Sequence, residues 1–273
     1  MQPMANMALR AARQAGQIIL RAMDRIDRLE IEQKGKNDFV SNIDKEAESA
    51  IIEVLHNAYP EHGILGEEHG ESFTSDEYTW VIDPLDGTTN FLQGIPHFCV
   101  SIALMKGPQF EHAVIVDPVS NEEFVASRGY GAQLNGKRMR VSSTDKLPHA
   151  LLNSGIPPAA IPEHLDAYMD MLKSFTRDCR ALRRSGSAAL DLAYVAAGRV
   201  DGYWEFGLNS WDIAAGVLLV REAGGFVGDL NGGDGFLSSG NIVAANPKVF
   251  KAMVQTIRPH LTAELSPGVE VRS

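Results

Sequence analysis

Long apolar runs are missing from this chain of 273 residues. The longest, Ile213–Val220, falls far short of the ~18 to 20 apolar residues that a membrane-spanning helix needs. The amino terminus has no basic segment followed by an apolar one, so we expect neither a signal peptide nor a membrane anchor. Cys99 and Cys179 are the only cysteines, too few for a disulfide framework or a cysteine-rich zinc site. We therefore expect a cytoplasmic protein.

Lysine and arginine are absent between Glu46 and Met105, although the chain has 25 of them. The charged share of 22% and the hydrophobic share of 44% are those of a folded protein and exclude a wholly disordered chain. The net charge of −10 argues against non-specific binding of nucleic acid over the whole surface. The base-free stretch contains these carboxylates: Glu46, Glu48, Glu53, Glu61, Glu67, Glu68, Glu71, Asp76, Glu77, Asp83 and Asp86.

These carboxylates have no local base to offset them. Two carboxylates ~4 Å apart repel by about 4 kcal/mol at an effective dielectric constant of 20. If several converge, a bound metal ion is the simplest source of positive charge. The remainder are expected to be solvated surface acids, and we assign these five to that group: Glu46, Glu48, Glu53, Asp76 and Glu77.

The hydrophobic pattern predicts helices and strands in an order typical of stacked layers. The predicted helices cover Met4–Met23, Ser41 or Asn42 to about Ala58, Pro162–Phe175, Ser187–Ala197, Trp211–Ala223 and Pro247–His260. The predicted strands cover Ile64–Leu65, Thr79–Ile82, Phe98–Met105, Glu111–Val116, Glu122–Ser127, Leu151–Ser154, Asp201–Phe206, Phe226–Leu230 and Ile242–Ala244. Lys34–Phe39 is expected to be a polar loop, and Asn135-Gly136 predicts a two-residue hairpin turn. We expect one continuous α+β body, with halves at about 1–147 and 148–262 and a tail at 263–273.

The densest chemical signal is the segment from Asp83 to Thr89, which reads Asp-Pro-Leu-Asp-Gly-Thr-Thr. A buried strand is predicted to stop at Pro84, so that both Asp83 and Asp86 face one point above its end. The carbonyl of Leu85 lies between them and can supply another hard oxygen ligand. Gly87, Thr88 and Thr89 then offer backbone N–H groups at the start of a short helix, which is a phosphate-binding geometry. Metal ligands beside a phosphate site indicate metal-assisted phosphoryl transfer.

A purely structural alternative remains open for this segment. An Asp-Pro-x-Asp-Gly turn can use both aspartates for local hydrogen bonds. Phosphatases that form an aspartyl-phosphate typically have one residue between two aspartates. Here two residues separate Asp83 from Asp86, and Pro84 follows the first of them, so Asp83 is not proposed as a nucleophile.

Three further acidic positions are candidates for the same site. Glu67 and Glu68 follow a short strand and can deliver a third metal ligand, or form an exposed acidic turn. Asp212 lies in the first turn of a helix that Ser210 can cap, which explains it without a metal, although a carboxylate there is also well placed to hold one. Glu205 ends a strand among aromatic residues and can bind substrate hydroxyl groups.

A basic cluster contrasts with the acidic chain. It contains Arg180, Arg183 and Arg184, which come shortly before the helix predicted from Ser187. A solvated surface is one interpretation; the others are a dimer contact and a docking patch for an acidic partner. We expect this cluster to lie on another surface than the acids.

Three motifs together resemble the signatures of the inositol monophosphatase family: Gly66-Glu67-Glu68, Asp83 to Asn90, and Trp211-Asp212-Ile213-Ala214-Ala215-Gly216. The likeness extends over nearly the whole chain, to about residue 260. Two stretches, Gln33–Val40 and Arg183–Leu192, resemble the bacterial SuhB subgroup of that family. The residues around Ser154–Pro158 differ from the animal enzymes, so sugar specificity follows less closely from the resemblance than reaction type.

The resemblance implies a five-layer αβαβα sandwich of the inositol monophosphatase and fructose-1,6-bisphosphatase type, present as a homodimer. It implies magnesium dependence with two or three ions, and inhibition by lithium. One ion would be held by Glu67, Asp83 and the Leu85 carbonyl, and a second by Asp83, Asp86 and Asp212, with Glu67 helping a third. Phosphate would contact Gly87 and Thr88, and inositol would contact Glu205. The preference for Glu67 over Glu68 rests on this resemblance alone.

We therefore predict a Mg²⁺-dependent phosphate monoesterase that acts on myo-inositol 1-phosphate, with Glu67 and Thr88 helping to deprotonate the attacking water. The predicted substrate contacts also include Asp86, Thr89 and Asp212. A broader phosphatase of sugar or nucleotide phosphates is a neighbouring alternative. The SuhB likeness implies a different alternative, a component of ribosomal RNA transcription that binds RNA polymerase and Nus-type antitermination factors.

Overall fold

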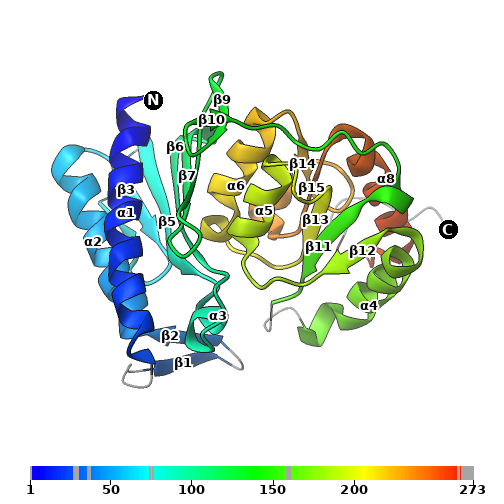
Figure 1. Ribbon diagram of the computed structural model, residues 1–273, viewed down its shortest axis with the longest axis horizontal. Coiled ribbons are helices and arrows are strands. Elements are labelled where there is room, and N and C mark those ends of the chain that lie inside the picture. Colours follow the sequence, from blue (N-terminus) through cyan, green and yellow to red (C-terminus); the bar gives the residue numbers. More distant parts are fainter. Residues whose placement is uncertain are drawn as a thin grey trace.

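Five layers of helices and sheets make up the protein (Figure 1). The computed structural model describes residues 2–26, 31–35, 38–73, 75, 77–157, 161–262 and 265. Helices α1 and α2 cover an eight-stranded sheet, α5 and α6 lie between that sheet and a five-stranded sheet, and α4 and α8 cover the outer face (Figure 1). The predicted αβαβα sandwich is therefore confirmed. The predicted tail at 263–273 lies outside the described residues apart from Leu265.

The first helical layer consists of α1 (Pro3–Met23) and α2 (Asn42–Ala58). The buried face of α1 is rich in alanine, which lets the helix pack closely on its neighbours. Ser41 caps α2 by accepting a hydrogen bond from the backbone N–H of Ile43. The predicted loop Lys34–Phe39 is wrong: β1 (Ile31–Gly35) and β2 (Asp38–Ser41) pair there as an antiparallel ribbon.

The large sheet is antiparallel except for one parallel pair, formed by β3 (Gly63–Gly66) and β5 (Tyr78–Asp86). In spatial order its strands are β10 (Lys137–Arg138), β9 (Gly131–Leu134), β8 (Glu122–Ser127), β7 (Gln109–Asp117), β6 (Cys99–Lys106), β5 (Tyr78–Asp86), β3 (Gly63–Gly66) and β4 (Gly70–Ser72). The predicted turn at Asn135 and Gly136 joins β9 to β10. Their φ values of 48° and 74° are both positive, as a tight hairpin turn of this kind requires.

Strand β5 was predicted to stop at Pro84, but it continues to Asp86. Its register against β6 shifts there: Asp83 lies opposite Ser101, and Asp86 lies opposite Cys99. One extra residue of β5 therefore bulges out between the two aspartates. A bulge leaves a residue outside the ladder of hydrogen bonds, so Pro84, which has no N–H, is tolerated within the strand.

The second sheet and its helices complete the fold. Its strands in spatial order are β12 (Ala181–Arg183), β11 (Leu151–Gly155), β13 (Gly202–Glu205), β15 (Ile242–Ala245) and β14 (Phe226–Gly228). The remaining helices are α3 (Thr88–Leu92), α4 (Ile161–Asp178), α5 (Ala188–Ala196), α6 (Ser210–Glu222), α7 (Phe236–Ser239) and α8 (Pro247–Ile257). Single 3₁₀ turns occur at Leu147–His149 and Arg258–His260.

Helices α5 and α6 are buried along nearly their whole length because a sheet lies on each side of them. They approach closely at Gly216, where a Cβ atom would lie 2.5 Å from the Leu192 side chain. No helix in the described part of the chain is both long and apolar enough to cross a membrane. The candidate site lies where five elements meet: the bulge of β5, the end of β13, and the first turns of α3, α5 and α6.

Candidate active site

Asp83 is the most deeply buried of the predicted acidic ligands, with 1% of its surface exposed. Burial raises the pKa of its carboxyl group well above the usual value, and the neighbouring acids Glu67, Asp86 and Asp212 raise it further. These four carboxyl groups, which come from three separate segments of the sequence, therefore lie close enough to repel one another. One oxygen of Asp83 accepts the N–H of Leu85 at 3.0 Å. That bond is the local turn contact that the structural alternative predicted for this aspartate.

Asp86 behaves differently, since its hydrogen bonds reach across the molecule. Its Oδ2 atom accepts the hydroxyl of Ser187 at 2.5 Å and the backbone N–H of Ala189 at 2.7 Å, at the first turn of α5. Burial raises the pKa of Asp86, while these two hydrogen bonds oppose that rise. A local turn therefore explains Asp83 in part and does not explain Asp86.

Asp212 lies in the first turn of α6, where its carboxylate accepts the backbone N–H of Asn209 at 2.7 Å. The predicted cap was wrong by one residue: Asn209 precedes the helix, and Ser210 is its first residue. Burial raises the pKa of Asp212 well above the usual value, and the charge of Asp86 adds to the rise. Helix capping accounts for the orientation of this side chain, but it does not account for the acids gathered around it.

The charge of this cluster fits a divalent cation. The strongest influences on the pKa values of Asp83, Asp86 and Asp212 are burial, hydrogen bonds and neighbouring acids, with no described lysine or arginine among them. Carboxylate oxygens are also the ligands that Mg²⁺ prefers. In the described residues, no three Asp, Glu, His or Cys side chains already surround one point as ligands. The fit to a metal therefore rests on donor chemistry and uncompensated charge rather than on a preformed coordination shell.

Directly beside the acids lie three further residues of the predicted site: Leu85, Gly87 and Thr88. The Thr88 hydroxyl lies 3.0 Å from the Leu85 carbonyl oxygen and 3.0 Å from Oδ1 of Asp44, and it can donate to either. Gly87 has a φ of 97°, a left-handed conformation that glycine adopts without strain, and it brings the chain into α3. The first N–H groups of α3, from Thr88 and Thr89, have no acceptor within the helix and are available to an anion.

Asp44 was missed by the sequence analysis. It is 1% exposed, and its carboxylate accepts hydrogen bonds from the Ser41 backbone N–H at 2.9 Å and from Thr88. Burial raises its pKa, and these hydrogen bonds oppose the rise. The pattern Ser41-x-x-Asp44 before an amphipathic run is a helix-start signal that could have identified it.

Glu205 ends β13 on the other side of the cluster. It accepts the phenolic hydroxyl of Tyr203 at 2.5 Å. The pKa of Glu205 is raised to about 7, mainly by burial and further by the charge of Asp86. The Tyr203 hydrogen bond and the charge of Arg184 oppose this rise. A Cβ atom on Gly155 would lie 2.3 Å from the Glu205 carboxylate, so glycine is needed opposite this side chain.

The comparisons with known proteins agree with this arrangement. The model of the inositol monophosphatase family matches residues 1–262. The chain belongs to the inositol monophosphatase family. It is 53% identical over 269 residues to a protein of Pseudomonas aeruginosa named Nus factor SuhB, covering 97% of this chain and 99% of that protein.

Two solved structures of the family are also similar. The extragenic suppressor protein SuhB from Bartonella henselae has a TM-score of 0.89 and 40% identity, with 97% of this chain and 98% of that chain covered. Inositol monophosphatase from Anabaena has a TM-score of 0.83 and 36% identity, with 93% and 94% covered. The predicted resemblance to the family and to its SuhB members is thereby confirmed.

The loop that follows β12 reaches the acidic site, contrary to the expectation for Arg184. Arg184 donates to the Ile156 carbonyl oxygen at 3.0 Å, and its charge acts on Glu205. Further along the loop, the carbonyl oxygen of Ser185 accepts the Asn90 side chain of α3 at 2.9 Å. Asn90 and Ser185 are 95 residues apart in the sequence, so that contact had no local signal.

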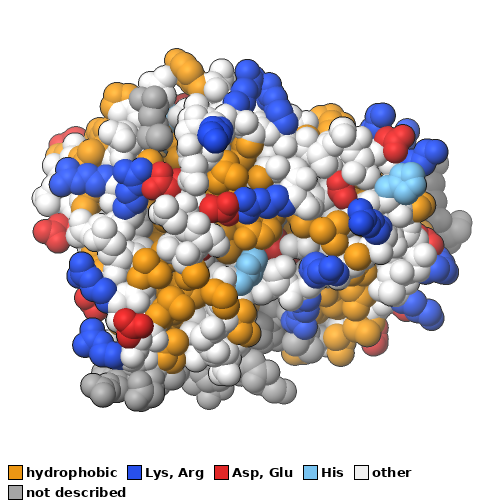
Figure 2. All heavy atoms as spheres, in the orientation of Figure 1, with side chains coloured by type: hydrophobic (Ala, Val, Ile, Leu, Met, Phe, Trp, Pro, Cys, Tyr) orange, Lys and Arg blue, Asp and Glu red, His pale blue; other side chains and the backbone are white. Residues whose placement is uncertain are grey.

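Arg180 and Arg183 remain at the surface. Both are exposed, as Arg184 also is, and Arg183 lies in β12, the edge strand of the second sheet. Figure 2 shows several basic side chains over the region where β12 and α4 lie in Figure 1. Their predicted role in a dimer or with a partner stays a prediction.

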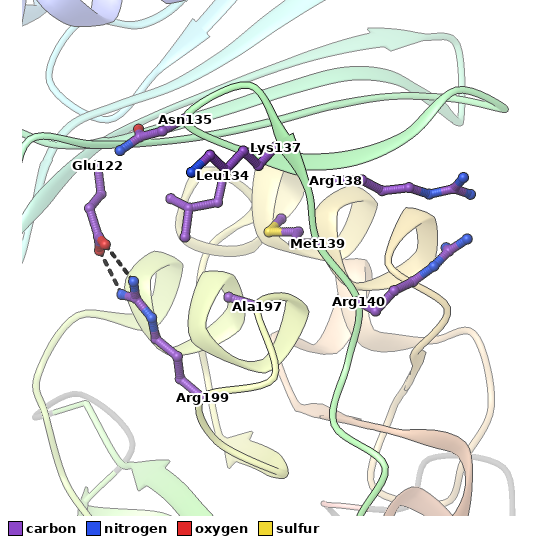
Figure 3. A pocket seen from close by; sticks show the side chains of 9 residues that line it. All are labelled: Glu122, Leu134, Asn135, Lys137, Arg138, Met139, Arg140, Ala197 and Arg199. Atoms are coloured by element: carbon purple, nitrogen blue, oxygen red, sulfur yellow. Dashed lines mark hydrogen bonds and ion pairs between the residues drawn. The ribbon is translucent and has the colours of Figure 1, made fainter.

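A separate cavity of about 470 Å³ lies between the β9–β10 hairpin and the end of α5 (Figure 3). On one side, Glu122 and Arg199 pair with each other; Arg138 and Arg140 point the other way (Figure 3). Ala197, just beyond the last turn of α5, lines this cavity, whereas Ala189 in its first turn bonds Asp86. The cavity is therefore not part of the acidic site.

One acid assigned to the surface was assigned wrongly. Glu48 is fully buried, whereas Glu46, Glu53 and Glu77 are exposed as expected. The fifth, Asp76, lies outside the described residues.

Proposed function

We propose that this chain is a Mg²⁺-dependent phosphate monoesterase, with myo-inositol 1-phosphate as its substrate. The observation that carries the proposal is the group formed by Asp83, which is buried, and by Asp86 and Asp212, which are partly buried. Burial raises the pKa of all three, and neighbouring acids raise those of Asp83 and Asp212 further. The free amides at the start of α3 adjoin this group and suit a phosphate. Membership of the inositol monophosphatase family supports the reaction class.

In this proposal Glu67, Asp83 and the Leu85 carbonyl hold one Mg²⁺, and Asp83, Asp86 and Asp212 hold another. Bound Mg²⁺ would lower the pKa of water and neutralise charge on the phosphoryl oxygens and the leaving alkoxide. Both effects lower the barrier to in-line displacement.

In this proposal, side chains and backbone amides of the protein accept the proton and orient the water and the substrate. Glu67 accepts the proton of the attacking water. The Thr88 hydroxyl orients that water by accepting a hydrogen bond from it, and donates its own hydrogen to Asp44, whose Oδ1 atom lies 3.0 Å away. The amides of Gly87 and Thr88 bind phosphoryl oxygens, and Glu205 binds a hydroxyl group of the inositol. The water oxygen bonds to phosphorus, the ester P–O bond breaks, and the alkoxide leaves as the alcohol after taking up a proton.

A panel of phosphate esters tests the proposal. Phosphate release is measured with myo-inositol 1-phosphate, several sugar phosphates and several nucleotides, each with Mg²⁺ and with a chelator. We expect Mg²⁺-dependent release that is fastest for the inositol ester. Fast release from many esters would favour the broader phosphatase, and release that persists in chelator would contradict the metal-dependent reaction.

A role in transcription is the second candidate. It is favoured by relatives named Nus factor SuhB at 53% and 51% identity. We propose that the chain, as a homodimer, associates with RNA polymerase and Nus-type factors through the exposed side of the arginine cluster. Purified RNA polymerase and Nus factors are tested for binding to the wild type, to Asp83→Asn and to Arg183→Glu. Loss of binding with Arg183→Glu alone would support a partner surface separate from the catalytic site.

A further inference from the structure

Glu48 is a buried carboxylate with an unusual set of partners. It lies on α2, and 0% of its surface is exposed. Its Oε1 atom accepts the backbone N–H of Glu68 at 3.1 Å, and its Oε2 atom accepts that of His69 at 2.9 Å. The His69 ring also contacts Oε2. Both carboxylate oxygens are therefore used to hold one short turn, and no described lysine or arginine pairs with this side chain.

The turn that Glu48 holds carries Glu67. On its other side, the backbone N–H of Glu67 donates to the Ile82 carbonyl oxygen of β5 at 3.1 Å. The peptide groups on both sides of Glu67 are thus fixed, one to the strand that carries Asp83 and the next to Glu48. Because the side-chain direction follows the backbone, these bonds aim Glu67 at Asp83, whose pKa its charge raises.

Gly66 shows how closely Glu48 fits beneath this turn. A Cβ atom at that position would lie 2.2 Å from Oε1 of Glu48 and 2.7 Å from its carboxyl carbon. The φ of Gly66 is not in the left-handed region, so the requirement for glycine comes from the carboxylate rather than from the backbone. The Glu48 carboxylate therefore occupies the space that any side chain at position 66 would need.

We infer that Glu48 is a positioning residue that sets the orientation of Glu67 toward the cation, a role that rests on the proposed metal-dependent function. An ionised carboxylate is costly to bury unless hydrogen bonds stabilise it. The two backbone N–H groups and the imidazole supply hydrogen bonds to this carboxylate. Groups that orient a metal ligand commonly change metal affinity by about 10- to 100-fold when they are replaced.

The test replaces Glu48 with glutamine, which has one acceptor oxygen and so cannot accept at both positions. The matched control is Glu46→Gln, which makes the same charge change at an exposed site on the same helix. Mg²⁺ binding is measured by calorimetry on metal-free protein, after circular dichroism and urea denaturation have verified the fold. We expect roughly 10-fold or greater weakening for Glu48→Gln and an unchanged affinity for Glu46→Gln. At saturating Mg²⁺, KM for the phosphate ester should change less than kcat.

A second variant keeps the inference testable if Glu48→Gln does not fold. His69→Ala removes a side chain that is 44% exposed and leaves both backbone hydrogen bonds in place. We expect a weakening of Mg²⁺ binding of several-fold, smaller than that of Glu48→Gln. Wild-type Mg²⁺ affinity in a folded Glu48→Gln, or in His69→Ala if that is the one that folds, would overturn the positioning role. A wild-type protein that binds no Mg²⁺ would instead overturn the proposed function.

Discussion

Ser187 joins the two halves of the site, and its replacement by alanine is the most informative stability test. Its hydroxyl donates to Oδ2 of Asp86 at 2.5 Å and accepts the Leu190 backbone N–H at 3.4 Å as the cap of α5. Ser187→Ala removes both contacts and leaves the backbone N–H groups of Ala188 and Ala189 as donors to Asp86. The loss therefore combines a helix cap with a hydrogen bond to a buried acid.

The magnitude follows from these two parts. Loss of a helix cap costs roughly 1 kcal/mol. Loss of a hydrogen bond to a charged group costs roughly 1.5–3 kcal/mol. We expect the free energy of unfolding to fall by roughly 2–4 kcal/mol, which lowers Tm by roughly 5–15 °C in a domain of this size. Mg²⁺ affinity should fall as well, because Asp86 loses the group that orients it.

Urea denaturation followed by circular dichroism measures this change, with Ser49→Ala as the control. Ser49 is exposed on α2, and its hydroxyl bonds only the Lys45 carbonyl oxygen of the same helix. The control should differ from wild type by less than about 0.5 kcal/mol. If Ser187→Ala also lost less than about 0.5 kcal/mol, the account of Asp86 as an acid anchored across the molecule would be refuted.

Three further predictions concern charge. Millimolar Mg²⁺ should raise Tm because a ligand of the folded state stabilises it, and Asp86→Asn should reduce the shift; an unchanged wild-type melting curve would contradict the metal site. Between pH 4.5 and about 7 the folded metal-free protein keeps the Glu205 proton that the unfolded chain releases, so Glu205 alone should lower the free energy of unfolding by up to about 3 kcal/mol as pH rises. Glu205→Gln should remove that part of the pH dependence in urea denaturation at several pH values, and an equally steep curve would contradict it. Arg183→Glu should leave phosphate release per folded subunit near wild type, whereas Arg184→Glu should lower it. Light scattering on the same samples reports any change of oligomeric state. Equal effects of the two variants on phosphate release would argue against the placement of Arg184 beside Glu205.

Local patterns predicted most of the elements. The alanine-rich period of α1 located that helix to within one residue at its start, and Asn135-Gly136 located a hairpin, because both signals depend on neighbouring residues. The ribbon of β1 and β2 was missed, since a polar composition does not distinguish a short exposed ribbon from a loop. Strand β5 was ended too early because a bulge that accommodates Pro84 has no clear signal in one sequence.

Burial of polar residues was harder to predict than secondary structure. Asp44, Glu48, Ile51 and Leu55 follow one another at helical spacing and all lie on the buried face of α2. Residue type suggested that Glu48 was a surface acid, whereas its position in the helix indicated burial. Contacts between distant segments, such as Asp86 with Ser187, depend on the packing of the second half against the first and had no local signal.

The central claim is that the buried carboxylates act by holding Mg²⁺ for phosphate ester hydrolysis. The most direct measurement is phosphate release from myo-inositol 1-phosphate by wild type and Asp83→Asn across a Mg²⁺ titration, with circular dichroism on both proteins. We expect wild-type release to rise and saturate with Mg²⁺, and the folded variant to lose most of its activity at every Mg²⁺ concentration. Near-normal release by folded Asp83→Asn in Mg²⁺ would contradict the claim.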